Sequence, residues 1–138
     1  MSCLQGVAAD SFAQSQAYIG QIVAAVLASP VYAKNTLILI HPDESGGYYD
    51  HLPPLQSPAP VDGAAYGPRM PLTAIGYAAA ANKVSHTPME PSSVLAFIEW
   101  NWFTNGVGQL GARDGAVNNI GSMLDPKKGP VPPDRQAH

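Results

Sequence analysis

The 138-residue chain has little charge, little basic character and a single cysteine. Only 12% of its residues are charged, about half of the roughly 25% usual in soluble domains. Seven Lys and Arg stand against ten Asp and Glu, which gives a formal net charge of −3. Nucleic acid and anionic membranes require a basic surface, so both are excluded as general partners. The lone Cys3 excludes an internal disulfide and a cysteine-rich zinc site.

Long apolar runs are also missing from the sequence. The longest strictly apolar stretch near the start covers residues 22–28, far short of the roughly 20 residues that span a bilayer. The first residues do not combine a basic segment with an apolar core, so the sequence predicts neither a transmembrane segment nor a secretory signal. This pattern leaves the localisation of the protein open.

Hydrophobic residues, glycine and proline are abundant. Hydrophobic side chains make up 46% of the chain, enough to form a core, and this excludes a wholly disordered protein. Thirteen Gly and fourteen Pro together form about a fifth of the sequence. That proportion is too high for a helical bundle and predicts long ordered loops between few regular elements.

The first third of the chain has the pattern of a helix followed by a strand. Apolar residues at helical spacing predict a helix over residues 11–29, which Pro30 ends because the residue before a proline avoids the helical region. Residues 36–40 form a continuous apolar run, typical of a central strand buried on both faces of a layered α/β sheet. Helix and strand together would form half of a βαβ unit, and residues 71–77 predict a second buried strand.

The C-terminal half predicts two further helices and a tail. Ser92 or Ser93 is expected to cap the first helix, with Glu99 facing away from its apolar face. The residues expected on that face are Val94, Leu95, Phe97, Ile98, Trp102 and Phe103. A short helix is expected over residues 114–124, and the four prolines of residues 126–138 predict a flexible tail after a domain of residues 1–125.

The chemistry of the chain is expected in residues 43–54, directly after the predicted first strand. Ligands of α/β sheets bind at the carboxyl ends of the strands. The adjacent carboxylates of Asp43 and Glu44 would repel each other unless a cation or a proton lay between them. Oxygen ligands of this kind suit Mg²⁺, Ca²⁺ or Mn²⁺, and Zn²⁺ becomes possible when a histidine joins them.

The same segment contains two glycines and a second acidic residue. Gly46 and Gly47 allow a sharp turn and a close approach of the backbone to a ligand. Asp50 and His51 bring a carboxylate and an imidazole back to the same neighbourhood. The alternative interpretation is an ordinary solvated turn, and residue types alone do not decide between the two.

The segment D-E-S-G-G-Y-Y-D-H-L-P-P at residues 43–54 resembles the D-E-x-G-G-[FY]-x-D-H-V-x-P-P motif of the bacterial phosphoesterase family. This family includes phosphocholine-type phospholipases C and acid phosphatases within the alkaline-phosphatase-like superfamily. Y-G-P-R-M-P at 66–71 resembles the family's [YG]-G-x-R-V-P, and V-S-H-T-P at 84–88 resembles its V-x-H-T-P. Residues 28–38, 92–99 and 110–119 resemble further family motifs, so the similarity extends from about residue 15 to 125 in the same order.

The resemblance implies a metal-assisted hydrolase of phosphate esters with an alkaline-phosphatase-like α/β fold. It implies that Asp43 and Glu44 are catalytic and hold a divalent metal ion, which is Ca²⁺, Mg²⁺, Mn²⁺ or Zn²⁺. Arg69 could grip a phosphate with two hydrogen bonds, or could be a loop-anchoring arginine. His51, Gly46 and Gly47 are expected on the substrate side of the site.

The chain departs from the family pattern in several places. Pro91 stands where relatives carry a histidine, and His86 matches a different family position. The predicted strand ends in His41-Pro42 instead of Thr-Tyr, and Ser45 has no evident base to activate it. Relatives carry an upstream motif, E-N-[RH]-S-[FY]-D, and a nucleophile. Neither occurs in this sequence. Relatives are also commonly exported. We therefore expect the C-terminal portion of a phosphoesterase, incomplete by itself.

An alternative from another class is a non-catalytic module for binding or oligomerisation. A partial sheet is expected to expose apolar surface, and such surfaces favour self-association. Pro91 and the missing nucleophile favour this alternative.

Overall fold

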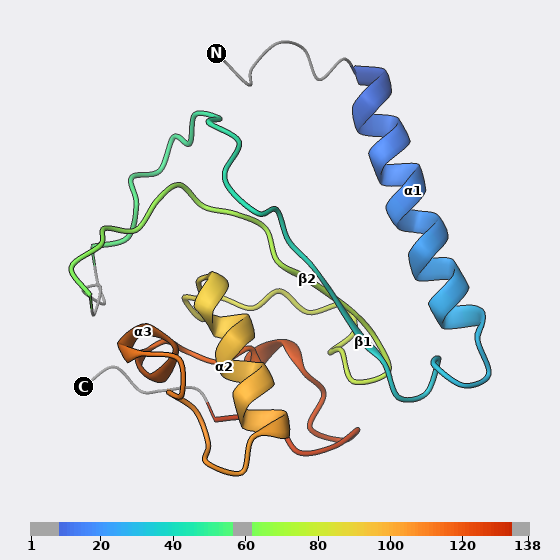
Figure 1. Cartoon of the computed structure of the whole chain (residues 1–138). Coiled ribbons are helices and arrows are strands. Elements are labelled where there is room, and N and C mark those ends of the chain that lie inside the picture. The colour runs from blue at the N-terminus through green and yellow to red at the C-terminus, as the bar shows by residue number, and fades with distance from the viewer. Residues whose placement is uncertain (1–8, 57–61, 134–138) are drawn as a thin grey trace.

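The computed structural model describes residues 9–56 and 62–133, and these form few regular elements separated by long loops (Figure 1). The elements are α1 (Ala9–Ala28), β1 (Leu37–Ile40), β2 (Thr73–Gly76), α2 (Pro91–Trp102), α3 (Ala112–Ala116) and the short 3₁₀ helix η1 (Gly121–Met123). The helix predicted over residues 11–29 is confirmed as α1, and both predicted strands exist, though shorter than expected. None of the helices described is long and apolar enough to cross a bilayer.

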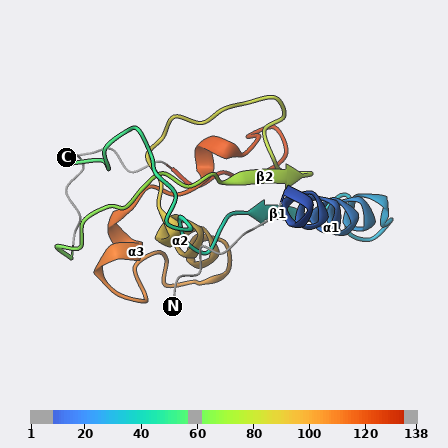
Figure 2. The ribbon, with the colours of Figure 1, turned by 90° about the horizontal axis from the view of Figure 1, so that it is seen from above.

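The strand pair lies between two helical layers (Figures 1 and 2). On one side is α1, and on the other are α2 and the C-terminal segment. Leu37 and Leu39 of β1 pack against the core beneath α2, whereas Ile38 and Ile40, together with Leu39, line a groove toward α1. Helices on both faces explain why β1 is apolar at every position.

Among the described residues, β1 is not the central strand of a layered sheet that the sequence predicted, and a strand that would complete the βαβ unit before α1 lies outside them. β1 pairs with β2 in antiparallel register, with Leu37 opposite Gly76 and Ile40 opposite Thr73, and the sheet has only these two strands. All four residues of β1 are half-buried, so β1 is not a deeply buried central strand. A parallel pair needs a crossover connection, whereas the chain here goes out and back through one long loop (Figure 1). Mixed helices and strands agree with the expected α/β class at this coarse level.

The hydrophobic core is small and lies between α2 and the C-terminal segment. Its buried members are Ala96, Phe97, Ile120 and Leu124. The Phe97 ring stacks on Trp100 at a centroid distance of 6.0 Å. Half-buried residues of β1, of the segments just before β2 and α2, and of the C-terminal segment complete the core. They are Leu37, Leu39, Leu72, Met89, Met123 and Val131.

The buried face of α2 differs from the one predicted. Glu99, expected to face away, is only 1% exposed, while Leu95, Ile98, Trp102 and Phe103 are exposed. Glu99 is buried because its carboxylate accepts backbone N–H groups from the loop that follows α2. The cap prediction is also wrong, because the helix begins at Pro91 with Glu90 as its N-cap, and Ser93 Oγ accepts the Glu90 N–H at 3.0 Å.

The segment after α2 is broken rather than one helix over 114–124. α3 ends at Ala116, and the buried Asn119 accepts the Ile120 N–H through its own side chain at 2.8 Å. Asparagine favours such local side-chain bonds, which compete with helix formation. In the predicted tail, Val131 packs against the core, and residues 134–138 lie outside the described chain.

Candidate functional site

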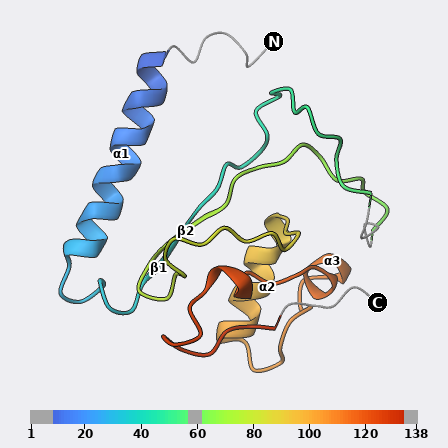
Figure 3. The same ribbon diagram turned by 180° about the vertical axis from the view of Figure 1, so that it is seen from behind.

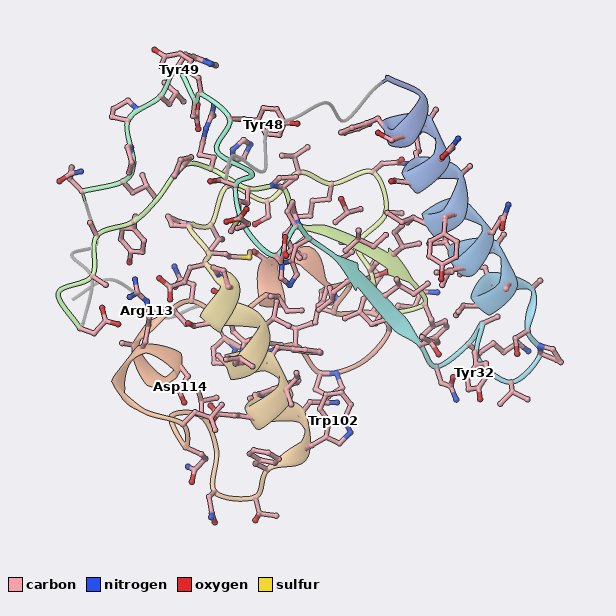
Figure 4. All side chains as sticks on the ribbon, turned by 45° about the horizontal axis from the view of Figure 1, so that its top comes forward. Tyr32, Tyr48, Tyr49, Trp102, Arg113 and Asp114 are labelled. Atoms are coloured by element: carbon pink, nitrogen blue, oxygen red, sulfur yellow. The ribbon has the colours of Figure 1, made fainter. Side chains whose placement is uncertain are left out.

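A surface hollow of about 450 Å³ lies between the outgoing and returning arms of the loop that joins β1 to β2. The outgoing arm contributes Ser45, Tyr48, Tyr49, Asp50 and His51, and the returning arm contributes Pro68, Arg69, Met70 and Pro71. Figure 4 shows Tyr48 and Tyr49 on the outgoing arm, far from α2. The hollow therefore contains parts of two segments that the sequence separates by about 20 residues.

Asp50 and Arg69 join the two arms. The Arg69 guanidinium donates from Nε to Asp50 Oδ2 and from Nη2 to Oδ1, both at 2.8 Å. The Arg69 backbone N–H donates to Oδ2 at 3.2 Å, and the Leu52 N–H donates to Oδ1 at 3.0 Å. Hydrogen bonds from Arg69 and Leu52 hold the pKa of Asp50 well below its ordinary value, and Asp50 in turn raises the pKa of Arg69.

This ion pair predicts acid sensitivity. The pKa of Asp50 is lowered in the folded chain, so its contribution to stability is present above the unfolded value of about 3.9 and is lost as the pH falls toward the folded value. We expect Asp50→Asn and Arg69→Met to reduce the loss of stability between pH 5 and pH 2, as measured by urea unfolding. The double variant should match either single variant, and an additive effect would contradict the pairing.

Arg69 acts as a loop anchor in this structure. Its side chain is 57% exposed, and the pair with Asp50 uses two of the five N–H groups of the guanidinium. Three N–H groups therefore remain outside the pair, on a side chain already fixed in position. The phosphate-binding role of Arg69 stays a prediction.

Asp43 and Glu44 lie at the edge of the hollow. They follow β1 by three and four residues, both are exposed, and neither lines the hollow, although Ser45 beside them does. Asp43 Oδ1 accepts the Glu44 N–H at 2.9 Å. Their roles as catalytic and metal-binding residues stay predictions.

The turn predicted at Gly46 and Gly47 is present. Both residues have positive φ, 68° and 72°, a conformation that favours glycine. A Cβ on Gly46 would approach the Tyr48 ring to 3.0 Å, so the turn is closely packed on one side. His51 lines the hollow with a side chain that is 79% exposed, and its Nδ1 lies 3.9 Å from Asp50 Oδ1.

The acidic residues at the edge have the donor chemistry of a divalent cation site. Mg²⁺ is commonly held by one or two carboxylates together with water and substrate phosphate. Asp43 and Glu44 could supply the carboxylates of such a ligand set. Within residues 9–56 and 62–133, no group of three or more His, Cys, Asp or Glu is placed to hold a metal. Further ligands would have to come from water, substrate or outside these ranges.

Arg113 was not singled out as a site residue, yet it joins three segments. It donates from Nε to Glu90 Oε1 at 2.6 Å and from Nη1 to both carboxylate oxygens of Asp62 at 2.7 Å. It also lies over the Tyr66 ring, 5.7 Å from the centroid, and Figure 4 places it beside Asp114 on α3. Arg113 therefore ties the returning arm to the N-terminus of α2. Its only signal in the sequence was its place in residues 110–119, which resemble a family motif.

Comparison with protein families matches residues 8–104 of this chain to the Phosphoesterase family. The matched part is more than half of the chain and includes β1, both arms of the hollow and α2. Among curated proteins, none matches this chain. The match supports a function of the phosphoester hydrolase type, and the chain belongs to the phosphoesterase family.

Proposed function

We propose that this chain takes part in metal-assisted hydrolysis of phosphate esters of the phospholipase C or acid phosphatase type. The observation that carries the proposal is the family match, because it spans the D-E-S-G-G loop and Arg69 together. These are the segments that form and border the hollow of about 450 Å³. The two arms are fixed to each other by the Asp50–Arg69 pair, which supports a preformed site.

In this proposal Asp43 and Glu44 hold the divalent cation, whether Ca²⁺, Mg²⁺, Mn²⁺ or Zn²⁺. When bound, such a cation polarises phosphoryl oxygens and offsets their charge. Both carboxylates are exposed at the rim, so they can reach a cation without a change in the buried core. The turn at Gly46 and Gly47 brings the backbone back toward the hollow immediately after them.

The substrate phosphate is placed against Arg69 and His51. The three N–H groups of Arg69 outside the Asp50 pair are donors suited to phosphate oxygens. The exposed imidazole of His51 stands on the opposite arm of the hollow, next to Asp50. Asp50 serves as a positioning residue, because it orients the Arg69 guanidinium and contacts His51.

The test is hydrolysis of p-nitrophenyl phosphate and bis(p-nitrophenyl) phosphate by the purified chain, with each of the four metals and with EDTA. Where a divalent metal supports turnover, Asp43→Asn/Glu44→Gln should lower it about 100-fold or more, because both charged ligands are lost while side-chain shape is kept. Asp125→Asn, a carboxylate outside the hollow, is the control and should change turnover less than twofold. Preference for the monoester indicates the phosphatase type, and preference for the diester indicates the phospholipase type.

Two results would contradict this proposal. Turnover that survives in EDTA would show that the reaction needs no divalent metal. Equal turnover in the double variant and the control would show that Asp43 and Glu44 do not take part in the reaction. Absence of turnover with every metal would favour the second candidate, a non-catalytic binding or oligomerisation module. The observation behind that candidate is the exposure of Phe12, Tyr18 and Ile22 on α1.

A further inference from the structure

The returning arm lies beside α3 at the tip of the long loop (Figure 3). Arg113 of α3 contacts three residues of this arm. Its Nη1 donates to both carboxylate oxygens of Asp62 at 2.7 Å, and its Nη2 donates to the Ala64 carbonyl oxygen at 3.5 Å. The guanidinium also lies over the Tyr66 ring, 5.7 Å from the centroid. Arg113 therefore holds the arm just before the arm reaches Arg69.

A different N–H group of the same guanidinium is bound to α2. Arg113 Nε donates to Glu90 Oε1 at 2.6 Å, and Glu90 is the N-cap of α2. The Glu90 side chain is only 9% exposed and that of Arg113 is 24% exposed, so this bond is shielded from water. A planar guanidinium can bind two carboxylates in different directions at once, which a lysine ammonium on a flexible stem does less well. Arg113 thus connects the arm to the N-terminus of α2.

The next fixed point of the arm is Arg69. It pairs with Asp50 of the outgoing arm through two hydrogen bonds of 2.8 Å. The Arg69 side chain is 57% exposed, and ion pairs open to water contribute little by themselves. One such pair holds the long loop of residues 41–72 only weakly against its conformational entropy. Pro68 restricts the backbone next to Arg69, so fixing the arm at Tyr66 also limits where Arg69 can lie.

We propose that Asp62 and Arg113 are positioning residues of the phosphate site. They keep the returning arm in the place where Arg69 pairs with Asp50 and offers its remaining N–H groups to a phosphate. Neither residue lines the hollow, so their effect passes through the arm. The inference rests on the proposed function for the identity of the ligand, a phosphate ester. It extends the site to α3, which lies beyond the residues 8–104 that match the family.

Asp62→Ala is the variant that tests the arm without disturbing the core. The Asp62 side chain is 42% exposed, and Arg113 keeps its bond to Glu90 when Asp62 is lost. Hydrogen bonds from the Ala64 N–H and from Arg113 lower the pKa of Asp62, so the link is charged at neutral pH. Removing the charge of Arg113 instead would leave the buried Glu90 carboxylate without its cation and weaken the fold itself.

The experiment is NMR measurement of the exchange of the Arg69 Nε–H with water in the full chain at pH 6.5. This N–H donates to Asp50 Oδ2, so it exchanges when the two arms separate. We expect exchange to be about 10-fold faster or more in Asp62→Ala. Arg113→Lys, which keeps the charge and loses the planar fork, should give a similar increase, and the double variant should give no more. Asp125→Asn changes a carboxylate outside the hollow and should leave the exchange within about twofold of wild type.

The pKa of Asp50, also followed by NMR, gives a second measurement with an unambiguous sign. Removing one carboxylate lowers the pKa of another acid or leaves it unchanged. A rise of about one unit in Asp62→Ala therefore reports the loss of the Arg69 partner, which holds the pKa of Asp50 down in the folded chain. Unchanged tryptophan emission from Trp100 and Trp102 on α2 shows that the core is intact in the variant.

Kinetics separate positioning from a merely structural role. Where the wild type hydrolyses p-nitrophenyl phosphate, Asp62→Ala should raise KM about 10-fold and leave kcat within about twofold. The reason is that phosphate binding is weakened, while the proposed metal ligands lie on the outgoing arm. A loss of folded protein would instead lower kcat and leave KM unchanged. Absence of turnover in the wild type would contradict the proposed function, and the exchange of Arg69 and the pKa of Asp50 would still decide this inference.

Any of three results would overturn the proposal. The first is an exchange rate of the Arg69 Nε–H in Asp62→Ala that matches wild type, and the second is an unchanged pKa of Asp50 in that variant. The third is an additive effect of Asp62→Ala and Arg113→Lys, which would show that the two residues act on the arm separately.

Discussion

Replacing Gly76 with alanine is expected to lower the free energy of unfolding by about 2–6 kcal/mol. Gly76 has a φ of 115°, which residues with a side chain rarely adopt, and such strain costs about 1–3 kcal/mol. A Cβ at this position would also lie 2.4 Å from the Thr36 carbonyl oxygen. The backbone would have to move apart at the end of the strand pair, and such overpacking costs a further 1–3 kcal/mol.

The measurement is urea unfolding of wild type and variant at one fixed protein concentration, with equal slopes required for the comparison. Gly67→Ala is the control, because an added Cβ there meets no atom within 4 Å and should change stability by less than about 1 kcal/mol. If both substitutions had the same small effect, the close approach of residues 36 and 76 would be wrong, and with it the register of Leu37 opposite Gly76.

In the sequence, Gly76 is one residue of a predicted strand, and only the register of the strand pair shows why a glycine is needed there. Local patterns were sufficient to predict α1 and β1, because helical spacing up to Pro30 and the run of four apolar residues are properties of neighbouring positions. They were not sufficient for the antiparallel pairing, because the same continuous apolar pattern is typical of parallel strands. The pairing depends on where the long loop returns, and that is set by contacts between distant residues.

The candidate site shows the same division between local and distant information. The turn at Gly46 and Gly47 could be predicted from residue type, since positive φ is a local property of glycine. The Asp50–Arg69 pair could not, because the partners are 19 residues apart and either could have faced solvent. The hollow lies between the two arms that this pair joins, so the sequence did not show that Tyr48 and Tyr49 line it, although Tyr48 matches the [FY] position of the family motif.

The orientation of α2 was mispredicted for a related reason. The hydrophobic pattern favoured a face containing Leu95 and Ile98, and a glutamate was expected on the opposite side. Glu99 is instead buried because two backbone N–H groups of the following loop need an acceptor there. Hydrophobic periodicity reports only the positions of apolar side chains. It contains no information about backbone N–H groups of a following loop that need an acceptor, so it could not predict that Glu99 is buried.

Replacing Glu99 with methionine is therefore expected to destabilise the fold, by about 2–6 kcal/mol. Glu99 Oε2 accepts the Gly108 N–H at 2.8 Å, and Oε1 accepts the Gln109 N–H at 2.9 Å. Methionine has similar length and favours helix formation, so the cost arises from two N–H groups left without an acceptor, at about 1–3 kcal/mol each. Urea unfolding at pH 7 measures the loss.

Two further variants separate this mechanism from a simple change in packing. Glu99→Gln keeps one acceptor oxygen and should lose about half as much stability as Glu99→Met. Asn101→Met, on the exposed side of the same helix, should stay within about 0.5 kcal/mol of wild type. The neighbouring Asp114 receives the Leu110 N–H at 2.9 Å, so the two carboxylates bind three consecutive backbone N–H groups. If Glu99→Met were as mild as Asn101→Met, Asp114 alone would be holding the loop, and the buried position of Glu99 would need another cause.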